Sequence, residues 1–325
     1  MTPSDFDYEA HRARLKPAAD AAKPPRGCPM MKAGFIGLGN IGLELARNLQ
    51  MSGVSLLVHD LDRSKATPLL DAGALWADSP AELASQVDVV LTSLPGPSQI
   101  ADVMGGEAGV LTGIRSGSIW VELSTTERAQ LLEIAEALAG LGCQTLDCPV
   151  TGGVAKAAQG AATLFVSGDG AMYLQCKPLL ESMATEIFYL GALGNAMTCK
   201  LITNLLVFAH IAVLGEGLMI GRLAGLDLNI LGNAINASFG ASVVSERHMN
   251  DILDGSYDSK FSLGLAVKDL GLIVQRALEL EAPLHVGKLV QHRFEEAAGR
   301  YGPDIGDLNT VRLLEDEAGV SLRSH

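Results

Sequence analysis

The stretch Ala33-Gly-Phe-Ile-Gly37-Leu-Gly39-Asn-Ile-Gly42 decides the fold of this 325-residue chain. Residues 33–36 are small or apolar and predict a buried strand, and a helical run begins after the third glycine. Gly37 permits a tight turn, Gly39 lets backbone N–H groups approach a pyrophosphate, and Gly42 lets the helix pack closely on the strand. The alternative is a glycine turn without a ligand. We expect a bound dinucleotide, contacted by Gly37, Leu38, Gly39, Asn40, Ile41 and Gly42.

An acidic residue at the end of the next apolar run indicates which dinucleotide is bound. Asp60 follows the strand-like run 54–59, where a carboxylate accepts hydrogen bonds from the ribose hydroxyls of NAD and repels the 2′-phosphate of NADP. Leu61 stands where an NADP-selective site would have an arginine. We therefore expect NAD, with NADP as the weaker alternative because Arg63 is near. Asp62 is a rival of Asp60 for this role.

Short apolar runs alternate with helical stretches from residue 33 to about residue 190. A helix is expected over 126–141, with Ser124 or Thr125 as its N-cap. Apolar runs of this density suit strands that helices cover on both faces, and the alternation predicts a parallel, doubly wound sheet of the Rossmann type. The expected strands are 33–36, 54–59, 87–92, 118–123, 143–147, 163–167 and 186–190.

The pattern changes after Gly194. Residues 195–224 predict one long helix, and the rest of the chain is helical, with glycines and prolines marking the turns. Residues 1–30 contain five prolines and no apolar period, which predicts a flexible tail. We expect three regions: this tail (1–30), an NAD-binding domain (31–193) and an all-α C-terminal domain (194–325) joined through the long helix.

Composition limits the classes of partner. The formal net charge is −13, so the surface repels a nucleic-acid backbone. Five cysteines without a CxxC pair indicate reduced thiols in a cytoplasmic protein, and the histidines lack metal-ligand spacing, so we expect no metal. The apolar window 201–220 contains Asn204, His210 and Glu216, which favours a buried helix over a membrane span. We expect no partner among nucleic acids or membranes.

Three further segments are similar to signatures of the β-hydroxyacid dehydrogenase family. Asp147-Cys-Pro-Val-Thr-Gly-Gly153 resembles its substrate motif, the segment from Gly194 to Asn204 its catalytic helix, and Phe261-Ser-Leu-Gly-Leu-Ala-Val-Lys268-Asp269 its C-terminal lysine motif. Leu94-Pro95 and Ser124-Thr125 fill two more family positions. The likeness runs from about residue 31 to the C-terminus. It implies an oxidoreductase that transfers a hydride between a small 3-hydroxy acid, or its semialdehyde or keto form, and a nicotinamide.

The resemblance also implies a set of site residues. Lys200 would be the general acid/base, with Asn204 beside it. The substrate carboxylate would be bound by Ser124, Thr151, Gly152 and Gly153. The cofactor would in addition meet Leu94, Pro95, Thr125 and Lys268.

Elementary chemistry agrees with these roles but leaves alternatives. A lysine with a pKa near 10.4 is too basic for proton exchange at neutral pH, and burial would lower that value. Asn204 lies one helical turn after Lys200, on the same face, and Gly152 and Gly153 offer unobstructed N–H groups to an anion. The alternatives are a solvated lysine at 200, a strand-to-helix turn at the glycines, and a surface ion pair for Lys268.

Departures from the family pattern leave the substrate open. Cys148 and Thr151 replace the usual alanine and serine, and Thr203 replaces a frequent asparagine. Two other functions stay in view: an imine reductase-like enzyme, whose known members usually lack a lysine at position 200, and a non-catalytic NAD-dependent binding protein. Excess apolar helix surface predicts a homodimer or homotetramer, with an intrachain core as the alternative.

Overall fold

The structure, a computed structural model, describes residues 31–323. The tail predicted for residues 1–30 lies outside the described residues. Residues 31–323 contain one sheet whose strands are β1 (Ala33–Ile36), β2 (Leu56–His59), β3 (Leu75–Trp76), β4 (Val89–Thr92), β5 (Ile119–Glu122), β6 (Gln144–Asp147), β7 (Val150–Thr151), β8 (Ala162–Gly168) and β9 (Ala184–Tyr189). Every strand expected from the sequence is present, with bounds that differ by at most two residues at each end. The two-residue strands β3 and β7 are too short to leave a pattern.

The strand order is β3-β2-β1-β4-β5-β6-β8-β7, and β9 pairs with β8. Strands β1 to β6 are parallel, as predicted, but β8 runs antiparallel to both β6 and β7. The predicted parallel sheet is therefore confirmed for β1 to β6, and this edge adds two antiparallel pairings that were not predicted. For β7 and β8 the physical reason is the short connection: a parallel return needs a crossover of a dozen or more residues, whereas only a six-residue helix and its turns separate these two strands.

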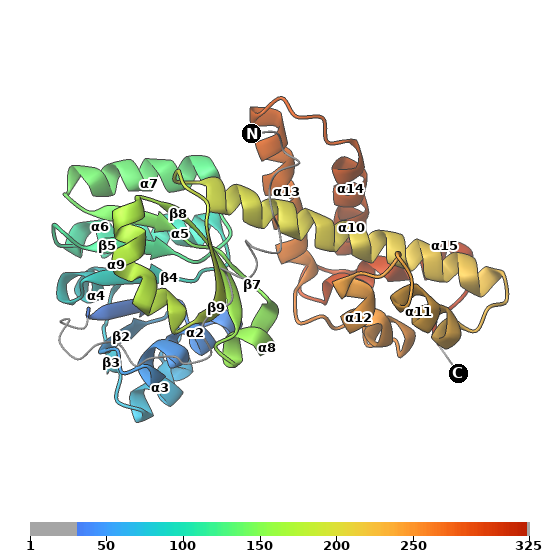
Figure 1. Cartoon of the computed structure of the whole chain (residues 1–325), viewed down its shortest axis with the longest axis horizontal. Coiled ribbons are helices and arrows are strands. Elements are labelled where there is room, and N and C mark those ends of the chain that lie inside the picture. Colours follow the sequence, from blue (N-terminus) through green and yellow to red (C-terminus); the bar gives the residue numbers. More distant parts are fainter. Residues whose placement is uncertain (1–30, 324–325) are drawn as a thin grey trace, which may run out of the picture. The chain divides into compact units, whose positions relative to one another are not determined.

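Helices cover both faces of the sheet (Figure 1). A separate apolar core lies on each side. Alternate residues of one strand serve opposite faces: on β1, Phe35 packs into one core and Ile36 into the other. One face carries α2 (Asn40–Met51), α3 (Thr67–Asp71), α8 (Gly153–Ala158) and α9 (Gly170–Glu181). The other carries α4 (Pro80–Gln86), α5 (Pro97–Gly105), α6 (Val110–Gly113) and α7 (Arg128–Gly140).

The start of α7 differs from the prediction. The helix begins at Arg128 with Glu127 as its N-cap and no capping side chain, so neither Ser124 nor Thr125 caps it. The Ser124 hydroxyl is engaged elsewhere, because its oxygen accepts a hydrogen bond from the backbone N–H of Leu94 at 2.8 Å.

From residue 195 to residue 323 the described chain is helical. The helices are α10 (Asn195–Leu223), α11 (Leu228–Asn236), α12 (Val243–Leu253), α13 (Leu263–Glu279), α14 (His285–Tyr301) and α15 (Arg312–Ala318), with a short 3₁₀ helix, η3 (Asp307–Val311), between the last two. Their shared core includes Phe208, Leu218 and Phe294. The predicted order, an NAD-binding α/β domain followed by a helical domain, is confirmed.

The long helix α10 is one continuous helix, drawn in yellow in Figure 1. By length and composition alone it could cross a membrane, and only 28% of its most apolar window is buried. The expectation of a buried helix is therefore correct for one face only. Lys200 and Asn204 lie on the buried face, whereas Ile202, Leu206 and Ile220 are exposed.

Candidate active site

The loop between β1 and α2 has the geometry that its three glycines predict. Gly37 has φ +95°, and a Cβ there would overlap the carbonyl oxygen of Ser93. A Cβ on Gly42 would overlap the carbonyl of Gly37, so the helix needs glycine to pack this closely. Gly39 is different, because the space that its Cβ would fill has no neighbour within 4 Å. The loop therefore leaves backbone exposed at the N-terminus of α2, as a pyrophosphate requires.

Asp60 lies against this loop. Its Oδ2 accepts the N–H of Leu38 at 2.7 Å and its Oδ1 accepts the N–H of Asp62 at 2.9 Å, while Lys65 Nζ is 3.4 Å from Oδ1. The rival carboxylate of Asp62 instead caps the 3₁₀ helix η2 (Arg63–Ala66) by accepting the N–H of Ser64. Of the two acids, Asp60 is the one that contacts the glycine loop.

Two more loops meet at Lys268. Its Nζ donates to the carbonyl oxygens of Pro95 at 3.0 Å and Thr125 at 2.8 Å, and forms an ion pair with Asp269 at 3.0 Å. Leu94, Pro95, Thr125 and Lys268 are thus brought together, as the resemblance implies. The alternative, a surface ion pair for Lys268, accounts for only one of these three contacts. The other two join α13 to the loops after β4 and β5.

Lys200 and Asn204 form a buried cluster with Asp269. Their exposed fractions are 9%, 8% and 3% respectively, and Asn204 Nδ2 donates to Asp269 Oδ2 at 2.6 Å. Burial lowers the pKa of Lys200 from 10.5 to about 8, with Asp269 opposing and Lys268 assisting the shift. Within residues 31–323, Lys200 Nζ has no hydrogen-bonded partner. The cluster therefore holds one amine that can gain or lose a proton near pH 8 and that is available to another molecule.

The predicted substrate loop lies at β7 and the start of α8. Gly152 and Gly153 have φ +117° and +77°, a conformation that side chains rarely adopt, and nothing lies within 4 Å of a Cβ on Gly153. Thr151 pairs with Thr163 of β8 and is half-buried. Among the described residues no hydrogen bond joins this loop to Lys200 or Asn204.

Sequence reasoning missed three buried acids. Asp269 holds Asn204 and Lys268, as described above. Glu122 and Asp147 are register partners at the ends of β5 and β6, both 0% exposed, and burial raises the pKa of each to about 7. Glu122 and Asp147 each end an apolar strand at the edge where the loops of a parallel sheet meet, but the position of an acid at a strand end does not by itself reveal its partners.

Asp147 ties the start of α10 to the sheet. Its Oδ2 accepts the N–H of Met197 at 2.8 Å and the hydroxyl of Ser167 at 3.0 Å, and that same serine oxygen accepts the N–H of Ala196. These contacts satisfy backbone donors in the first turn of the helix. The helix that carries Lys200 is therefore anchored three residues before it.

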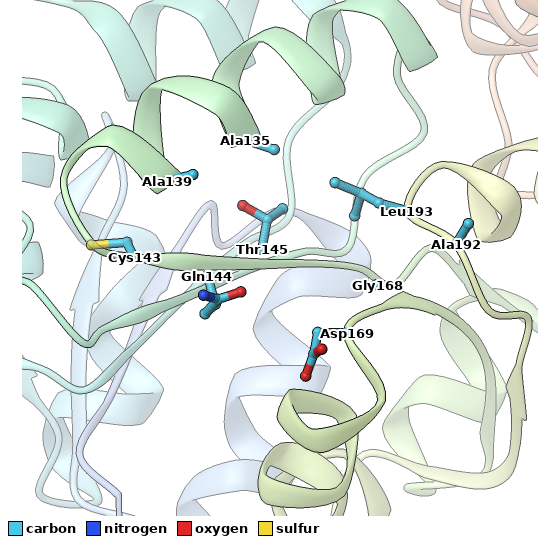
Figure 2. Close-up of a pocket in the computed structure, with 9 residues that line it drawn as sticks. All are labelled: Ala135, Ala139, Cys143, Gln144, Thr145, Gly168, Asp169, Ala192 and Leu193. Carbon is cyan, nitrogen blue, oxygen red and sulfur yellow. The ribbon is translucent and has the colours of Figure 1, made fainter.

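A pocket of about 290 Å³ is lined by none of these residues (Figure 2). Ala135 and Ala139 of α7, Thr145 of β6 and Leu193 are among its lining residues, and it includes none of the predicted site residues. Among residues 31–323 no group of three or more His, Cys, Asp and Glu side chains could hold a metal ion.

A glycine loop opening a helix on a parallel sheet, an acid against that loop and a buried lysine next to an asparagine together define a nicotinamide dinucleotide-dependent oxidoreductase. Comparison with known proteins narrows this class. The family model for the NAD binding domain of 6-phosphogluconate dehydrogenase matches residues 32–191. The model for the NAD-binding region of NADP-dependent 3-hydroxyisobutyrate dehydrogenase matches residues 194–314.

Comparisons with individual proteins and solved structures agree with the two family models. L-threonate dehydrogenase of Escherichia coli K12 is 32% identical over 89% of this chain and 95% of its own length. A 3-hydroxyisobutyrate dehydrogenase structure from Salmonella typhimurium has a TM-score of 0.80 at 31% identity, over 87% of this chain and 99% of that one. The structure of Psf3 with NADP⁺ and 2-OPP also has a TM-score of 0.80, at 29% identity over 87% of this chain and 99% of that one.

The chain belongs to the β-hydroxyacid dehydrogenase family. It is an NAD-binding oxidoreductase that acts on the CH–OH group of 3-hydroxy acids.

Proposed function

We propose that Lys200 exchanges the hydroxyl proton of a small 3-hydroxy carboxylate during its oxidation, and returns that proton in the reverse direction. The observation that carries this proposal is the buried amine itself, with a pKa near 8 and no hydrogen-bonded partner among the described residues. A base works best when its pKa lies near the working pH. When protonated, the same amine stabilises the alkoxide that forms from a carbonyl.

Asn204 orients this proton exchange. Its amide nitrogen donates to Asp269, which leaves the amide oxygen free to face Lys200 or the substrate hydroxyl. Asp269 also pairs with Lys268, and these two charges act on the Lys200 pKa in opposite directions, so the lowering by burial is the larger effect.

The glycine loop fits NAD, whose nicotinamide accepts the hydride when the cofactor is bound. Gly37 and Gly42 shape the loop, Gly39 leaves it open, and Asp60 is in place to accept ribose hydroxyls. We propose that NAD is preferred over NADP, because a 2′-phosphate would lie against the Asp60 carboxylate. Lys65, 3.4 Å from Asp60, is the residue that works against this preference.

The substrate class is proposed to be a small carboxylate. Gly152 and Gly153 present backbone N–H groups without side chains, and Thr151 adds a hydroxyl next to them. Threonine in place of the family's usual serine adds a methyl group there, which favours a compact acid.

The test is a panel of 3-hydroxy acids assayed by NADH or NADPH absorbance. Lys200→Ala should abolish turnover while NAD binding, measured by calorimetry, stays unchanged. Lys177→Ala is the matched control, since Lys177 is an exposed lysine paired with Glu181 on α9. NAD binding by the wild-type chain without turnover of any acid would contradict the enzyme and favour a binding protein, and turnover of cyclic imines by Lys200→Ala would favour an imine reductase.

We further propose that two copies of the chain associate through α10. Ile202, Leu206, Val213 and Ile220 are all exposed and recur at helical spacing along one face. Gly217 on this face has open space at its Cβ position, so a second helix can approach closely. Light scattering should find a dimer for the wild type and a monomer for Val213→Glu. Leu174→Glu, at an exposed leucine of α9, should remain a dimer. A wild-type monomer at high concentration would contradict this.

We propose a cytoplasmic location. The four cysteines within the described residues are free thiols, three of them buried, as suits a reducing compartment. Fractionation of the native cells with an antibody to the chain tests this, and recovery in the membrane or an oxidising compartment would contradict it.

A further inference from the structure

We propose that Glu122 is a positioning residue, whose buried carboxylate fixes the loop at Leu94 and Pro95 through the hydroxyl of Ser124. This inference rests on the proposed function, because it assigns that loop to the cofactor side of the site. It gives a role to an acid that the proton-exchange scheme does not use.

The Glu122 carboxylate accepts every hydrogen bond that it forms, and a second donor lies behind one of its partners. Trp120 Nε1 donates to Thr92 Oγ1 at 2.8 Å, and Thr92 in turn donates its hydroxyl to Glu122 Oε2 at 2.9 Å. Glu122 Oε1 accepts the N–H of Ser124 at 2.6 Å, and the Ser124 hydroxyl also bonds the carboxylate. All these partners are donors, so the site is built for an acceptor on both oxygens.

Ser124 passes this constraint to the loop. Its oxygen accepts the N–H of Leu94 at 2.8 Å, so the hydroxyl proton is left for Glu122 and the oxygen is held from two sides. The Leu94 side chain lies against Gly37, since a Cβ on that glycine would be 3.0 Å from Leu94 Cδ2. The next carbonyl, of Pro95, accepts from Lys268. The loop is thus fixed between the dinucleotide loop and the helix α13.

The free-energy cost of this arrangement supports a role beyond packing. Glu122 is 0% exposed, and no cation pairs with it among residues 31–323. Burial raises its pKa to about 7, while the donors from Ser124 and Thr92 act in the opposite sense and Asp147 adds to the rise. Burying a carboxylate is costly, and an apolar residue would pack at this strand end at lower cost.

The inference predicts a shared phenotype for two variants. Glu122→Gln replaces one acceptor by an NH₂ group that faces a donor, and Ser124→Ala removes the acceptor of the Leu94 N–H. Each should lower kcat on the order of 10- to 100-fold, because small misplacements of a reacting group cost this much. The NAD dissociation constant should change less than about threefold, since the adenosine half is held by the glycine loop. The double variant should be no slower than the slower single variant.

Ser118→Ala is the matched control, because Ser118 is buried at the opposite end of the same strand and should leave kcat unchanged. If Ser124 instead contacts the substrate directly, Ser124→Ala would raise KM for the acid and its effect would multiply with that of Glu122→Gln, which would overturn the inference. A Glu122→Gln variant with the kcat of the wild type would also overturn the inference.

A readout without turnover separates this inference from the proposed function. Amide hydrogen exchange at Leu94 should be faster in Glu122→Gln and in Ser124→Ala than in the wild type and in Ser118→Ala. Faster exchange in a chain that turns over no acid would refute the proposed function alone, and unchanged exchange would refute the positioning role. If Glu122→Gln does not fold, Ser124→Ala gives the same test.

Discussion

Replacing Lys200 by methionine should abolish oxidation of the substrate and at the same time stabilise the fold. Methionine keeps the length and apolar stem of the lysine side chain but removes the buried amine. The fall of the Lys200 pKa from 10.5 to about 8 means that the protonated form costs about 3 kcal/mol in the folded chain, and this sets the upper limit of the gain. Asp269 keeps Lys268 and Asn204 as partners, so the substitution leaves no carboxylate stranded.

The sign of the pH dependence follows from linkage. Between pH 8 and pH 10.5 the unfolded wild type binds more protons at this lysine than the folded chain does, so wild-type stability rises with pH across that window. The variant lacks the titrating group, and its advantage should therefore be largest below pH 8 and shrink to nothing near pH 10.5.

Urea unfolding of both proteins at pH 7 and pH 10 measures this difference. Lys177→Met controls for loss of a positive charge, because Lys177 is exposed and its replacement relieves no buried charge. A Lys200→Met protein that is less stable than the wild type at pH 7, or an advantage that does not depend on pH, would refute the picture of an amine destabilised by burial.

Three further outcomes are expected. In the direction of alcohol oxidation, kcat/KM should rise about tenfold per pH unit up to about pH 8 and then level off, because the base must be deprotonated. A pH profile that is flat from pH 6 to 9 would exclude Lys200 as that base. Asp60→Ala should reduce the ratio of kcat/KM with NAD to kcat/KM with NADP roughly 10- to 100-fold, because a hydrogen bond to a charged group contributes this much. Steady-state kinetics with both cofactors measures the ratio, and an unchanged ratio would show that Asp60 does not select the cofactor. Gly42→Ala should abolish NAD binding in calorimetry, because its Cβ overlaps the Gly37 carbonyl, whereas Gly271→Ala, with nothing near its Cβ, should bind normally; equal binding would contradict the loop geometry.

The sequence predicted those parts of the fold that short-range rules govern. Strand β1 and helix α10 have the predicted bounds to within a residue, because apolar runs and glycine turns mark their ends in the chain itself. The antiparallel edge at β8 was missed because it depends on the length of the β7–β8 connection, not on residue type. The predicted cap of α7 failed because the Ser124 hydroxyl bonds a backbone group 30 residues away, and no local pattern reveals such a partner.

The predictions for the site divide in the same way, between residues that one local motif contains and residues that only tertiary packing brings together. The shared buried face of Lys200 and Asn204 was predicted because both lie in one motif, one helical turn apart, while their roles in the reaction stay predictions. Their partner Asp269 stands 65 residues further on, and only the packing of α13 against α10 reveals that it holds Asn204. Glu122 was missed because an isolated acid at a strand end has no signature until its three donors are in place. The roles assigned to Thr151, Gly152 and Gly153 stay predictions.

The anchoring of α10 at Asp147 makes the helix a lever whose pivot lies next to Lys200. At a rise of about 1.5 Å per residue, Lys200 is only about 4.5 Å from the pivot at Met197, while Leu223 is about 39 Å away. A tilt of about 10° would displace the far end by roughly 7 Å and the lysine by less than about 1 Å. Substitutions along the distal two-thirds of this helix can therefore accumulate with little effect on the position of Lys200.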